Sequence, residues 1–281
     1  MQICKTIAEI RNLLKHRRGQ GHLIGFVPTM GYLHEGHLTL MRRAKEQCQT
    51  VVMSIFVNPL QFGPKEDFSG YPRDFERDAA LSEKVGVDAI FAPEGEEMYS
   101  SGFCTYVEVQ RLTDKLCGAS RPGHFRGVTT VVAKLFNIIQ PDYAYFGQKD
   151  AQQALVIRRM VADLNMALEV ITVPTVREPS GLAMSSRNSL LSEEGRAAAA
   201  VLYRSLEAAR LAVARGEKDA KELRRLVVDM IGREKLANLD YAEIHSLPDL
   251  EPLSTLQGQA LLALAVKIGK VRLIDNIILE A

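Results

Sequence analysis

Two histidines stand three positions apart in the segment His34-Glu35-Gly36-His37. Residues at this spacing share one face of a helix, so both imidazoles can meet a single ligand. The start of a helix also presents exposed backbone N–H groups and the positive end of the helix dipole, which favour an anion. Gly31 and Gly36 allow the backbone to approach such a ligand closely. The pattern therefore predicts a phosphate site, and a triphosphate would fit it.

Two other interpretations of the histidine pair remain open. One histidine could cap the helix while the other packs against the fold. Alternatively, the pair could bind a metal, but the interval differs from the His-Glu-x-x-His spacing of zinc proteases. Because local spacing reveals no third ligand, no metal-ligating residue is identified from the sequence.

A second polar segment, Met184-Ser185-Ser186-Arg187, lies in a Gly/Ser/Pro-containing loop over residues 177–189. Two hydroxyls and a guanidinium can hold phosphate oxygens, and a mobile loop that bears them can close over a nucleotide. An ordinary linker between domains is the alternative.

Further candidates follow other predicted strands. Asp150 can cap the next helix and Lys149 can reach a phosphate, whereas a surface salt bridge between them is the alternative. Gln61 and Gln153 are uncharged hydrogen-bonding groups suited to a hydroxy acid, although either side chain could simply be solvated. Arg121 could meet a carboxylate or a phosphate.

The segment Tyr71-Pro-Arg73-Asp74 and the nearby Asp78 could reach a cleft or bind magnesium. A charged, solvated helix face is the explanation that we favour for these residues.

Hydrophobic patterning supplies the elements that must position these side chains. Apolar, β-branched runs predict buried strands at residues 23–29, 50–58, 87–92, 143–146 and 168–174. Helix-period segments lie between them at residues 37–48, 73–85, 128–139 and 150–164. This alternation predicts an α/β fold with a Rossmann-like, doubly wound parallel sheet, in which ligands bind beyond the carboxyl ends of the strands.

The pattern changes after Val173. Two helices are expected at residues 192–216 and 219–236, followed by alternating runs at 239–245, 259–267 and 271–279 with a hairpin turn at 267–270. We therefore expect a domain over residues 1–176 and a smaller C-terminal α+β domain over residues 177–281.

Composition limits the class of protein. The formal net charge is +1, which disfavours nucleic acid as a partner. The longest apolar stretch, residues 260–266, is far shorter than the roughly 18 residues that suggest a membrane span. The four cysteines show no metal-ligand spacing and no signal peptide is evident, so a soluble, cytoplasmic protein is expected.

These motifs, taken in order along the chain, resemble the pantothenate synthetase family. The resemblance rests on residues 28–40, 54–62, 71–73, 121–125, 146–153 and 173–188, and so spans nearly the whole chain. The His-x-Gly-His motif alone also occurs in nucleotidyltransferases and class I aminoacyl-tRNA synthetases. The combination of motifs favours the synthetase family, whose fold is of the same nucleotidyltransferase type.

The resemblance implies roles for individual residues. His37 would be the catalytic histidine, assisted by His34, Lys149, Ser185, Ser186 and Arg187. Pantoate would bind Gln61 and Gln153, and Gln61 would also line the β-alanine site. The implied ATP contacts are Met30, Gly31, Tyr32, Leu33, His34, Glu35, Gly36, His37, Gly147, Gln148, Lys149, Asp150, Val176, Met184, Ser185, Ser186 and Arg187.

The implied reaction has two steps, with Mg²⁺ accompanying ATP. The pantoate carboxylate attacks the α-phosphorus of ATP and pyrophosphate leaves; the β-alanine amine then attacks the pantoyl-adenylate and AMP leaves. The sequence identifies no base for the amine. The family is usually homodimeric, so a homodimer is expected. A nucleotidyltransferase and a non-catalytic adenine-nucleotide sensor are the remaining alternatives.

Overall fold

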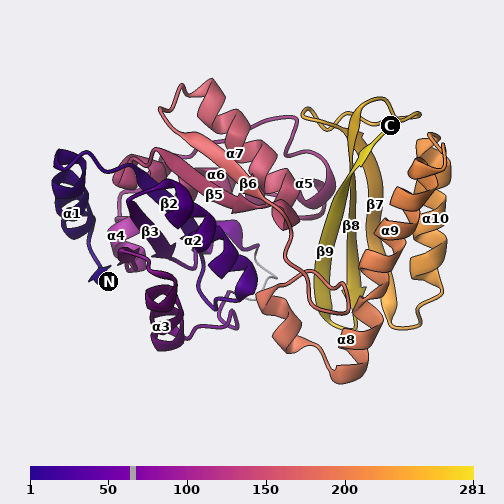
Figure 1. Cartoon of the computed structure of the whole chain (residues 1–281), viewed down its shortest axis with the longest axis horizontal. Helices are drawn as coiled ribbons and strands as arrows, with labels where there is room; N and C mark the ends of the chain where they lie inside the picture. Colours follow the sequence, from indigo (N-terminus) through magenta and orange to yellow (C-terminus); the bar gives the residue numbers. More distant parts are fainter. Residues whose placement is uncertain (64–67) are drawn as a thin grey trace. The chain divides into compact units, whose positions relative to one another are not determined.

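The computed structural model describes residues 1–63 and 68–281, which form two compact units (Figure 1). The parallel-sheet unit comprises residues 1–113, 121–148 and 153–174. The antiparallel-sheet unit comprises residues 114–120, 149–152 and 175–281. The functional domain boundary that we expect between residues 176 and 177 stays a prediction.

A six-stranded parallel sheet forms the first unit, with strand order β1-β4-β3-β2-β5-β6. Its strands are β1 (Gln2–Cys4), β2 (Ile24–Thr29), β3 (Thr50–Ile55), β4 (Ala89–Phe91), β5 (Tyr143–Gly147) and β6 (Glu169–Val173). From β2 the chain proceeds outward to β3 and β4, and then returns to place β5 on the other side of β2. This reversal confirms the predicted doubly wound sheet, and such folds bind ligands beyond the strand ends at this point.

Helices cover both faces of this sheet. The long helices are α1 (Ile7–Gly19), α2 (Glu35–Gln47), α3 (Phe75–Val85), α6 (His124–Ile139) and α7 (Ala151–Asp163), and a short α4 spans Gly95–Met98. On one face, Met41 of α2 belongs to a buried cluster with Val27 and Met53 of the strands. The opposite face packs through Phe136 of α6, whose ring meets Phe26 edge-on with centroids 6.4 Å apart.

The predicted alternation omitted the first strand and the first helix. β1 adds an edge strand beside β4, and α1 begins at Ile7 after a capping box in which Thr6 accepts from the Glu9 N–H group. The Thr-x-x-Glu spacing is a signal for such a helix start. The sequence therefore contained the signal for α1, which our prediction missed.

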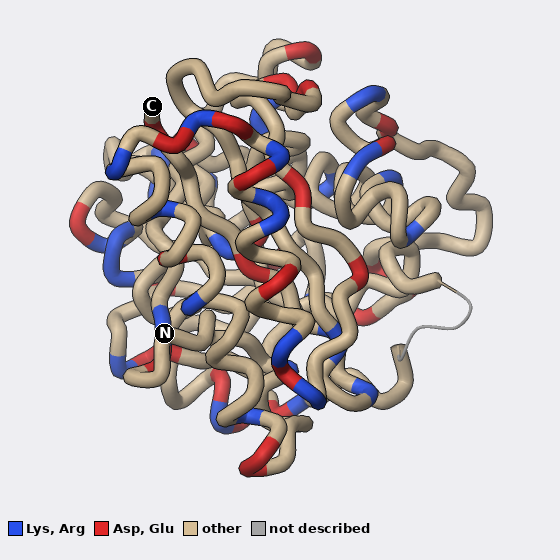
Figure 2. Tube along the Cα trace, turned by 90° about the vertical axis from the view of Figure 1, so that its right-hand side faces the viewer, with Lys and Arg blue, Asp and Glu red and all other residues tan. Residues whose placement is uncertain are grey.

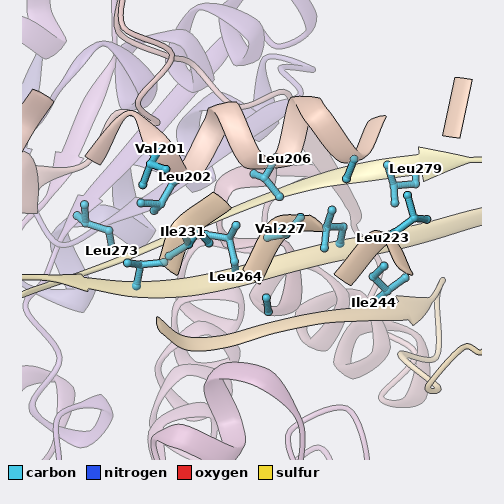
Figure 3. Close-up of a cluster of buried hydrophobic side chains, with 14 of the residues drawn as sticks. Val201, Leu202, Leu206, Leu223, Val227, Ile231, Ile244, Leu264, Leu273 and Leu279 are labelled. Carbon is cyan, nitrogen blue, oxygen red and sulfur yellow. The ribbon is translucent and has the colours of Figure 1, made fainter. Parts of the chain in front are cut away.

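The second unit is a three-stranded antiparallel sheet, β7-β8-β9, with helices packed against it. Its strands are β7 (Ala237–Ser246), β8 (Gln259–Ile268) and β9 (Val271–Glu280), and its main helices are α8 (Glu193–Ala199), α9 (Val201–Ala214) and α10 (Ala220–Gly232). Figure 3 shows α9 residues such as Leu206 and α10 residues such as Val227 meeting Leu264 of β8 in one buried cluster. The predicted hairpin turn is present, with Gly269 at φ +58° between β8 and β9.

The single helix expected over residues 192–216 is two helices. The Ala200 N–H group bonds the Ala197 carbonyl three residues back, at 3.3 Å, which ends α8 before α9 begins. The alanine-rich sequence around this point favours helix on both sides, so the break could not be located from helix propensity.

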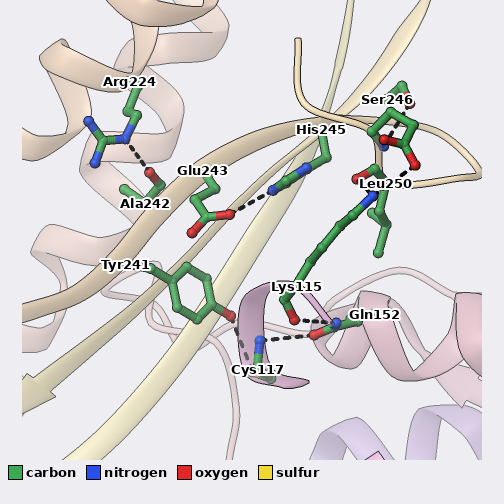
Figure 4. Close-up of polar contacts among 11 residues, drawn as sticks. Lys115, Cys117, Gln152, Arg224, Tyr241, Ala242, Glu243, His245, Ser246 and Leu250 are labelled. Carbon is green, nitrogen blue, oxygen red and sulfur yellow. Dashed lines mark hydrogen bonds and ion pairs between the residues drawn. The ribbon is translucent and has the colours of Figure 1, made fainter. Parts of the chain in front are cut away.

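Two short segments join the antiparallel-sheet unit through polar contacts that Figure 4 shows. The Gln152 carboxamide accepts from the Cys117 N–H group at 3.0 Å and donates to the Lys115 carbonyl at 2.7 Å. The thiol of Cys117, in turn, lies 3.2 Å from the Tyr241 hydroxyl on β7. These contacts tie α5 (Leu116–Ser120) and the start of α7 to the sheet.

Acidic and basic residues are interspersed over the chain trace (Figure 2). Among the described residues, no helix is both long and apolar enough to cross a membrane.

Candidate active site

His34 and His37 stand at the N-terminal end of α2, just beyond the carboxyl end of β2. His34 is the N-cap residue, and its Nδ1 accepts from the Gly36 N–H group at 3.2 Å. The Nδ1 atom of His37 accepts from the backbone N–H group of His34 at 3.3 Å. The two rings lie 4.0 Å apart between centroids, so the predicted shared face is confirmed.

This hydrogen-bond pattern assigns the proton of each neutral ring. Because Nδ1 accepts a backbone N–H group in both His34 and His37, the proton belongs on Nε2. The capping bonds thus orient both rings through Nδ1. A ligand that binds through Nε2 does not compete with these bonds. An imidazole with its proton on Nε2 can donate that proton in a hydrogen bond to a phosphate oxygen.

The loop that precedes these histidines has its own backbone N–H groups bonded within the protein. We expected exposed N–H groups at the start of the helix, and the three groups described here come just before that start. The Gly31 N–H group donates to Thr29 Oγ1 at 3.1 Å, and those of Tyr32 and Leu33 donate to the Asp78 carboxylate at 2.6 and 2.7 Å. An anion near these three residues would therefore be met by side chains and by the N-terminus of α2 with its dipole.

Asp78 overturns the prediction of a solvated helix face. It lies on α3 with 1% of its surface exposed, and its two carboxylate oxygens separately accept the two loop N–H groups. Gly31 adopts φ +84°, and a Cβ atom there would stand 3.0 Å from Asp78 Oδ2, so glycine permits this close approach. Asp78 therefore holds the first loop in place.

Burial raises the pKa of Asp78, in spite of the N–H donors from Leu33 and Tyr32. A raised pKa means that the folded protein keeps this proton to a higher pH than the unfolded chain does. The contribution of this group to stability therefore declines as the pH rises from the unfolded value, near 4, through the raised folded value.

Gln61 ends the short 3-10 helix η1 (Pro59–Gln61), which follows β3. Its Oε1 accepts from Asn58 Nδ2 at 3.1 Å, and its Nε2 lies 3.1 Å from the sulfur of Met30 in the first loop. The carboxamide is thus oriented by Asn58, which is itself 1% exposed and accepts the Tyr99 hydroxyl at 2.8 Å. Asn58 was not predicted as a site residue, although it lies within residues 54–62, one of the segments that carry the family resemblance.

The backbone of Gln61 is also held. His124 Nδ1 donates to the Gln61 carbonyl at 2.9 Å, while Arg121 donates to His124 Nε2 at 3.0 Å. From the sequence, Arg121 could meet a carboxylate or a phosphate; the structure records its contact with His124. Gln153 is half-buried one turn into α7, and its neighbour Gln152 makes the structural contacts to α5.

Lys149 lies in the antiparallel-sheet unit and belongs to the 3-10 helix η2 (Gln148–Asp150). This helix follows directly after Gly147, a predicted site residue that ends β5. Its ammonium lies 3.9 Å from the Asp150 carboxylate, so the salt bridge considered as an alternative is present but long. The Lys149 side chain is 19% exposed. This ion pair does not prevent a phosphate contact, because it is long and its Asp150 partner is 48% exposed, so it contributes little.

The loop over residues 177–189, for which an ordinary linker was the alternative interpretation, is a hydrogen-bonded hairpin. The Met184 N–H group bonds the Val176 carbonyl at 2.9 Å, and Asn188 Nδ2 bonds Glu178 Oε1 at 2.8 Å. Ser185 caps the 3-10 helix η3 (Ser186–Leu190), accepting from the Arg187 N–H group at 3.3 Å. The predicted mobility of this loop stays a prediction.

Replacing Asp78 by asparagine tests the anchor of the first loop. An amide presents one N–H₂ group where the carboxylate presents an acceptor, so one loop N–H group loses its partner. We expect the free energy of unfolding to fall by about 1–3 kcal/mol, measured by urea denaturation. Asp74→Asn is the matched control, because Asp74 caps the same helix from a solvated position and asparagine caps equally well. Equal stability of both variants and the wild type would contradict the assigned role.

Comparison with known proteins places the whole chain in one family. Residues 2–278 match the family model described as pantoate-beta-alanine ligase. A pantothenate synthetase of Pelotomaculum thermopropionicum is 70% identical over 279 residues, which are 99% of each chain. One of Heliobacterium modesticaldum is 58% identical over 280 residues and the full length of both.

Solved structures agree with this match. A pantothenate synthetase from Thermus thermophilus superposes with a TM-score of 0.94 at 50% identity, over 99% of both chains. A pantoate-beta-alanine ligase from Francisella tularensis, solved in complex with beta-gamma ATP and beta-alanine, gives a TM-score of 0.80 at 35% identity over 99% of this chain and 97% of that one. With its paired histidines on a doubly wound sheet, the chain belongs to the pantoate-beta-alanine ligase family.

Proposed function

We propose that this chain condenses pantoate with β-alanine in two steps driven by ATP. In the first, a pantoate carboxylate oxygen attacks the α-phosphorus, forming pantoyl-adenylate as the bond to pyrophosphate breaks. In the second, the β-alanine nitrogen attacks the acyl carbon, AMP leaves, and the amine loses a proton. The match to the ligase family over residues 2–278 is the observation that carries this proposal.

His34 and His37 are proposed to stabilise negative charge on the phosphates of ATP. The centroids of the two rings lie 4.0 Å apart, and Nδ1 of each ring accepts a backbone N–H group. Two Nε2 donors held by capping bonds are preorganised, so no reorientation is needed as charge develops in the transition state. Met30 through Gly36 would line the nucleotide through their shape and side chains, because several of the loop N–H groups are already bonded.

Cationic and hydroxyl groups of the antiparallel-sheet unit are also proposed to bind ATP. Lys149 and Arg187 supply charge, and Ser185 and Ser186 supply hydroxyls, in the roles that the family resemblance implies. The remaining proposed ATP contacts are Gly147, Gln148, Asp150, Val176 and Met184. In this proposal residues 1–176 bind ATP and pantoate, and residues 177–281 act as the lid domain.

Gln61 and Gln153 are proposed to bind pantoate, with Gln61 also lining the β-alanine site. The support for Gln61 is its orientation: Asn58 holds its side-chain oxygen and His124 holds its carbonyl. A carboxamide fixed in this way can recognise a hydroxyl or carboxylate group with little loss of conformational entropy.

Mg²⁺ is proposed to accompany ATP. Within residues 1–63 and 68–281, no cluster of three His, Cys, Asp or Glu side chains is arranged to hold a metal. Mg²⁺ does not require such a cluster, because it keeps several waters and binds largely through substrate phosphates, where it neutralises charge. We further propose a cytoplasmic homodimer, as the family resemblance implies.

Exchange of labelled pyrophosphate into ATP tests the proposed function. We expect exchange that depends on pantoate, and pantothenate and AMP in equal amounts once β-alanine is added. Binding of ATP without exchange would indicate a nucleotide sensor instead. A stable dinucleotide-like product formed without an amine would indicate a nucleotidyltransferase.

His37→Ala removes one of the two oriented rings. We expect the exchange rate to fall by about 10²- to 10⁴-fold, the range for loss of a preorganised transition-state donor. His16→Ala is a suitable control, since that histidine lies in the last turn of α1. Unchanged exchange in folded His37→Ala protein would defeat the role assigned to this ring.

Gly127→Ala tests the placement of Gln61. A Cβ atom at position 127 on α6 would lie 2.2 Å from the Leu60 carbonyl oxygen and 2.6 Å from the Gln61 nitrogen, so the η1 backbone must move. We expect the KM for pantoate to rise by about tenfold to a hundredfold, because small misplacements of binding groups have large effects.

The matched control for this substitution is Gly95→Ala. Gly95 is also helical, but a Cβ atom there meets nothing within 4 Å. Steady-state kinetics on both variants decides the question. A wild-type KM for pantoate in folded Gly127→Ala protein would show that Gln61 does not depend on this packing.

A further inference from the structure

Two adjacent residues of β9, Asp275 and Asn276, contact two segments that lie far apart in the sequence. Both are almost completely buried, with 2% and 4% of their surfaces exposed. Asp275 binds Arg177 at the base of the 177–189 hairpin, and Asn276 binds the backbone of Lys149 in η2. All four residues belong to the antiparallel-sheet unit.

The contact between Asp275 and Arg177 is bidentate. Arg177 donates to the two carboxylate oxygens at 2.6 and 3.0 Å, and Asp275 Oδ1 also accepts the Asn276 N–H group at 2.8 Å. This geometry fixes the plane of the guanidinium as well as its position. Arg177 side-chain exposure is 16%, so the pair is largely removed from water.

Arg177, which is held by Asp275, also contacts the hairpin and the helix beneath it. It donates to the Gly181 carbonyl at 3.1 Å, and its guanidinium lies 4.0 Å from the centre of the Tyr203 ring on α9. Gly181 has φ +90°, and a Cβ atom there would lie 2.3 Å from Tyr203, so the hairpin packs tightly on that ring. At the base of the hairpin, the Met184 N–H group bonds the Val176 carbonyl. Ser185 follows directly after this bond.

The contact between Asn276 and Lys149 acts on the second segment. Asn276 Nδ2 donates to the Lys149 carbonyl at 2.9 Å. The carbonyl belongs to the same residue whose ammonium is proposed to reach a phosphate. Fixing the backbone there limits the positions that the ammonium can sample.

We propose that Asp275 and Asn276 are positioning residues for adenylate formation, because they hold the Lys149 segment and the Ser185–Arg187 segment in one fixed arrangement. The inference rests on the proposed function of those two segments. Neither β9 residue needs to touch a substrate. Replacing either residue should slow the ATP-dependent step, because the groups that they position are those proposed to bind the phosphates.

Two variants test this inference separately. Asn276→Ala removes the bond to Lys149 without introducing charge. Asp275→Asn keeps the size of the side chain but leaves the Arg177 guanidinium without its carboxylate, which is costly for a buried pair. For each we expect the affinity for ATP, measured by calorimetry, to fall about tenfold and pantoate-dependent exchange to fall by about tenfold to a hundredfold. The KM for β-alanine should stay within about twofold of wild type.

Asp240→Asn is the matched control. Asp240 pairs with Arg272 through two bonds of 2.9 and 2.7 Å in the same sheet, but that pair contacts neither phosphate-binding segment. We expect wild-type affinity for ATP in this variant. A purely structural role would instead lower the folded fraction in thermal unfolding and leave the affinity for ATP of the folded protein unchanged.

Wild-type affinity for ATP and wild-type exchange in folded Asn276→Ala protein would overturn the inference, whatever the fate of Asp275→Asn. The proposed function fails by a different result, namely wild-type protein that binds ATP but shows no exchange with pantoate. In that case the affinities of the two variants for ATP still decide whether β9 positions the nucleotide-binding segments.

Discussion

The buried carboxylate of Asp78 holds the loop on which the candidate site depends. It accepts two consecutive backbone N–H groups, from Tyr32 and Leu33, and so fixes the path of the chain between β2 and α2. The capping bonds of His34 and His37 begin directly after this point. The orientation of both rings therefore depends on the carboxylate of a neighbouring helix, which lies 45 residues away in sequence from Leu33.

This arrangement changes the physical basis of anion binding at the first loop. Helix N-termini often hold phosphates with free backbone N–H groups. Here the N–H groups of Gly31 through Leu33 have acceptors within the protein. In the proposed function, a nucleotide at this loop instead meets the oriented imidazoles of His34 and His37. Because the capping bonds fix both rings before charge develops, the rings can stabilise the transition state without reorganising.

The sequence allowed prediction of the elements whose patterns are local. Strands β2 to β6 and the long helices α2, α3, α6 and α7 follow from β-branched runs alternating with helix-period segments, whereas the short helices α4 and α5 were not predicted. β1 and α1 were missed even though Thr6 and Glu9 form a capping box. The role of Asp78 could not be predicted, because its neighbours on α3 include Glu76 and Arg77, and a charged helix face has the same composition. Only tertiary packing shows which carboxylate is buried.

The same limit applies to the antiparallel-sheet unit, where the sequence identified the Ser185–Arg187 segment but not the residues that support it. Asp275 lies in an apolar strand, and nothing in that strand indicates that Arg177, 98 residues away, is its partner. In each unit a buried carboxylate binds a segment with a proposed role in ATP binding, and neither carboxylate is itself proposed to contact a substrate. A buried charge without a partner is unfavourable by several kcal/mol, so each carboxylate strongly favours the single conformation of the segment that satisfies it. The cationic side chains of Lys149 and Arg187, which are proposed to contact phosphate, can then remain partly exposed while the backbone that bears them stays fixed.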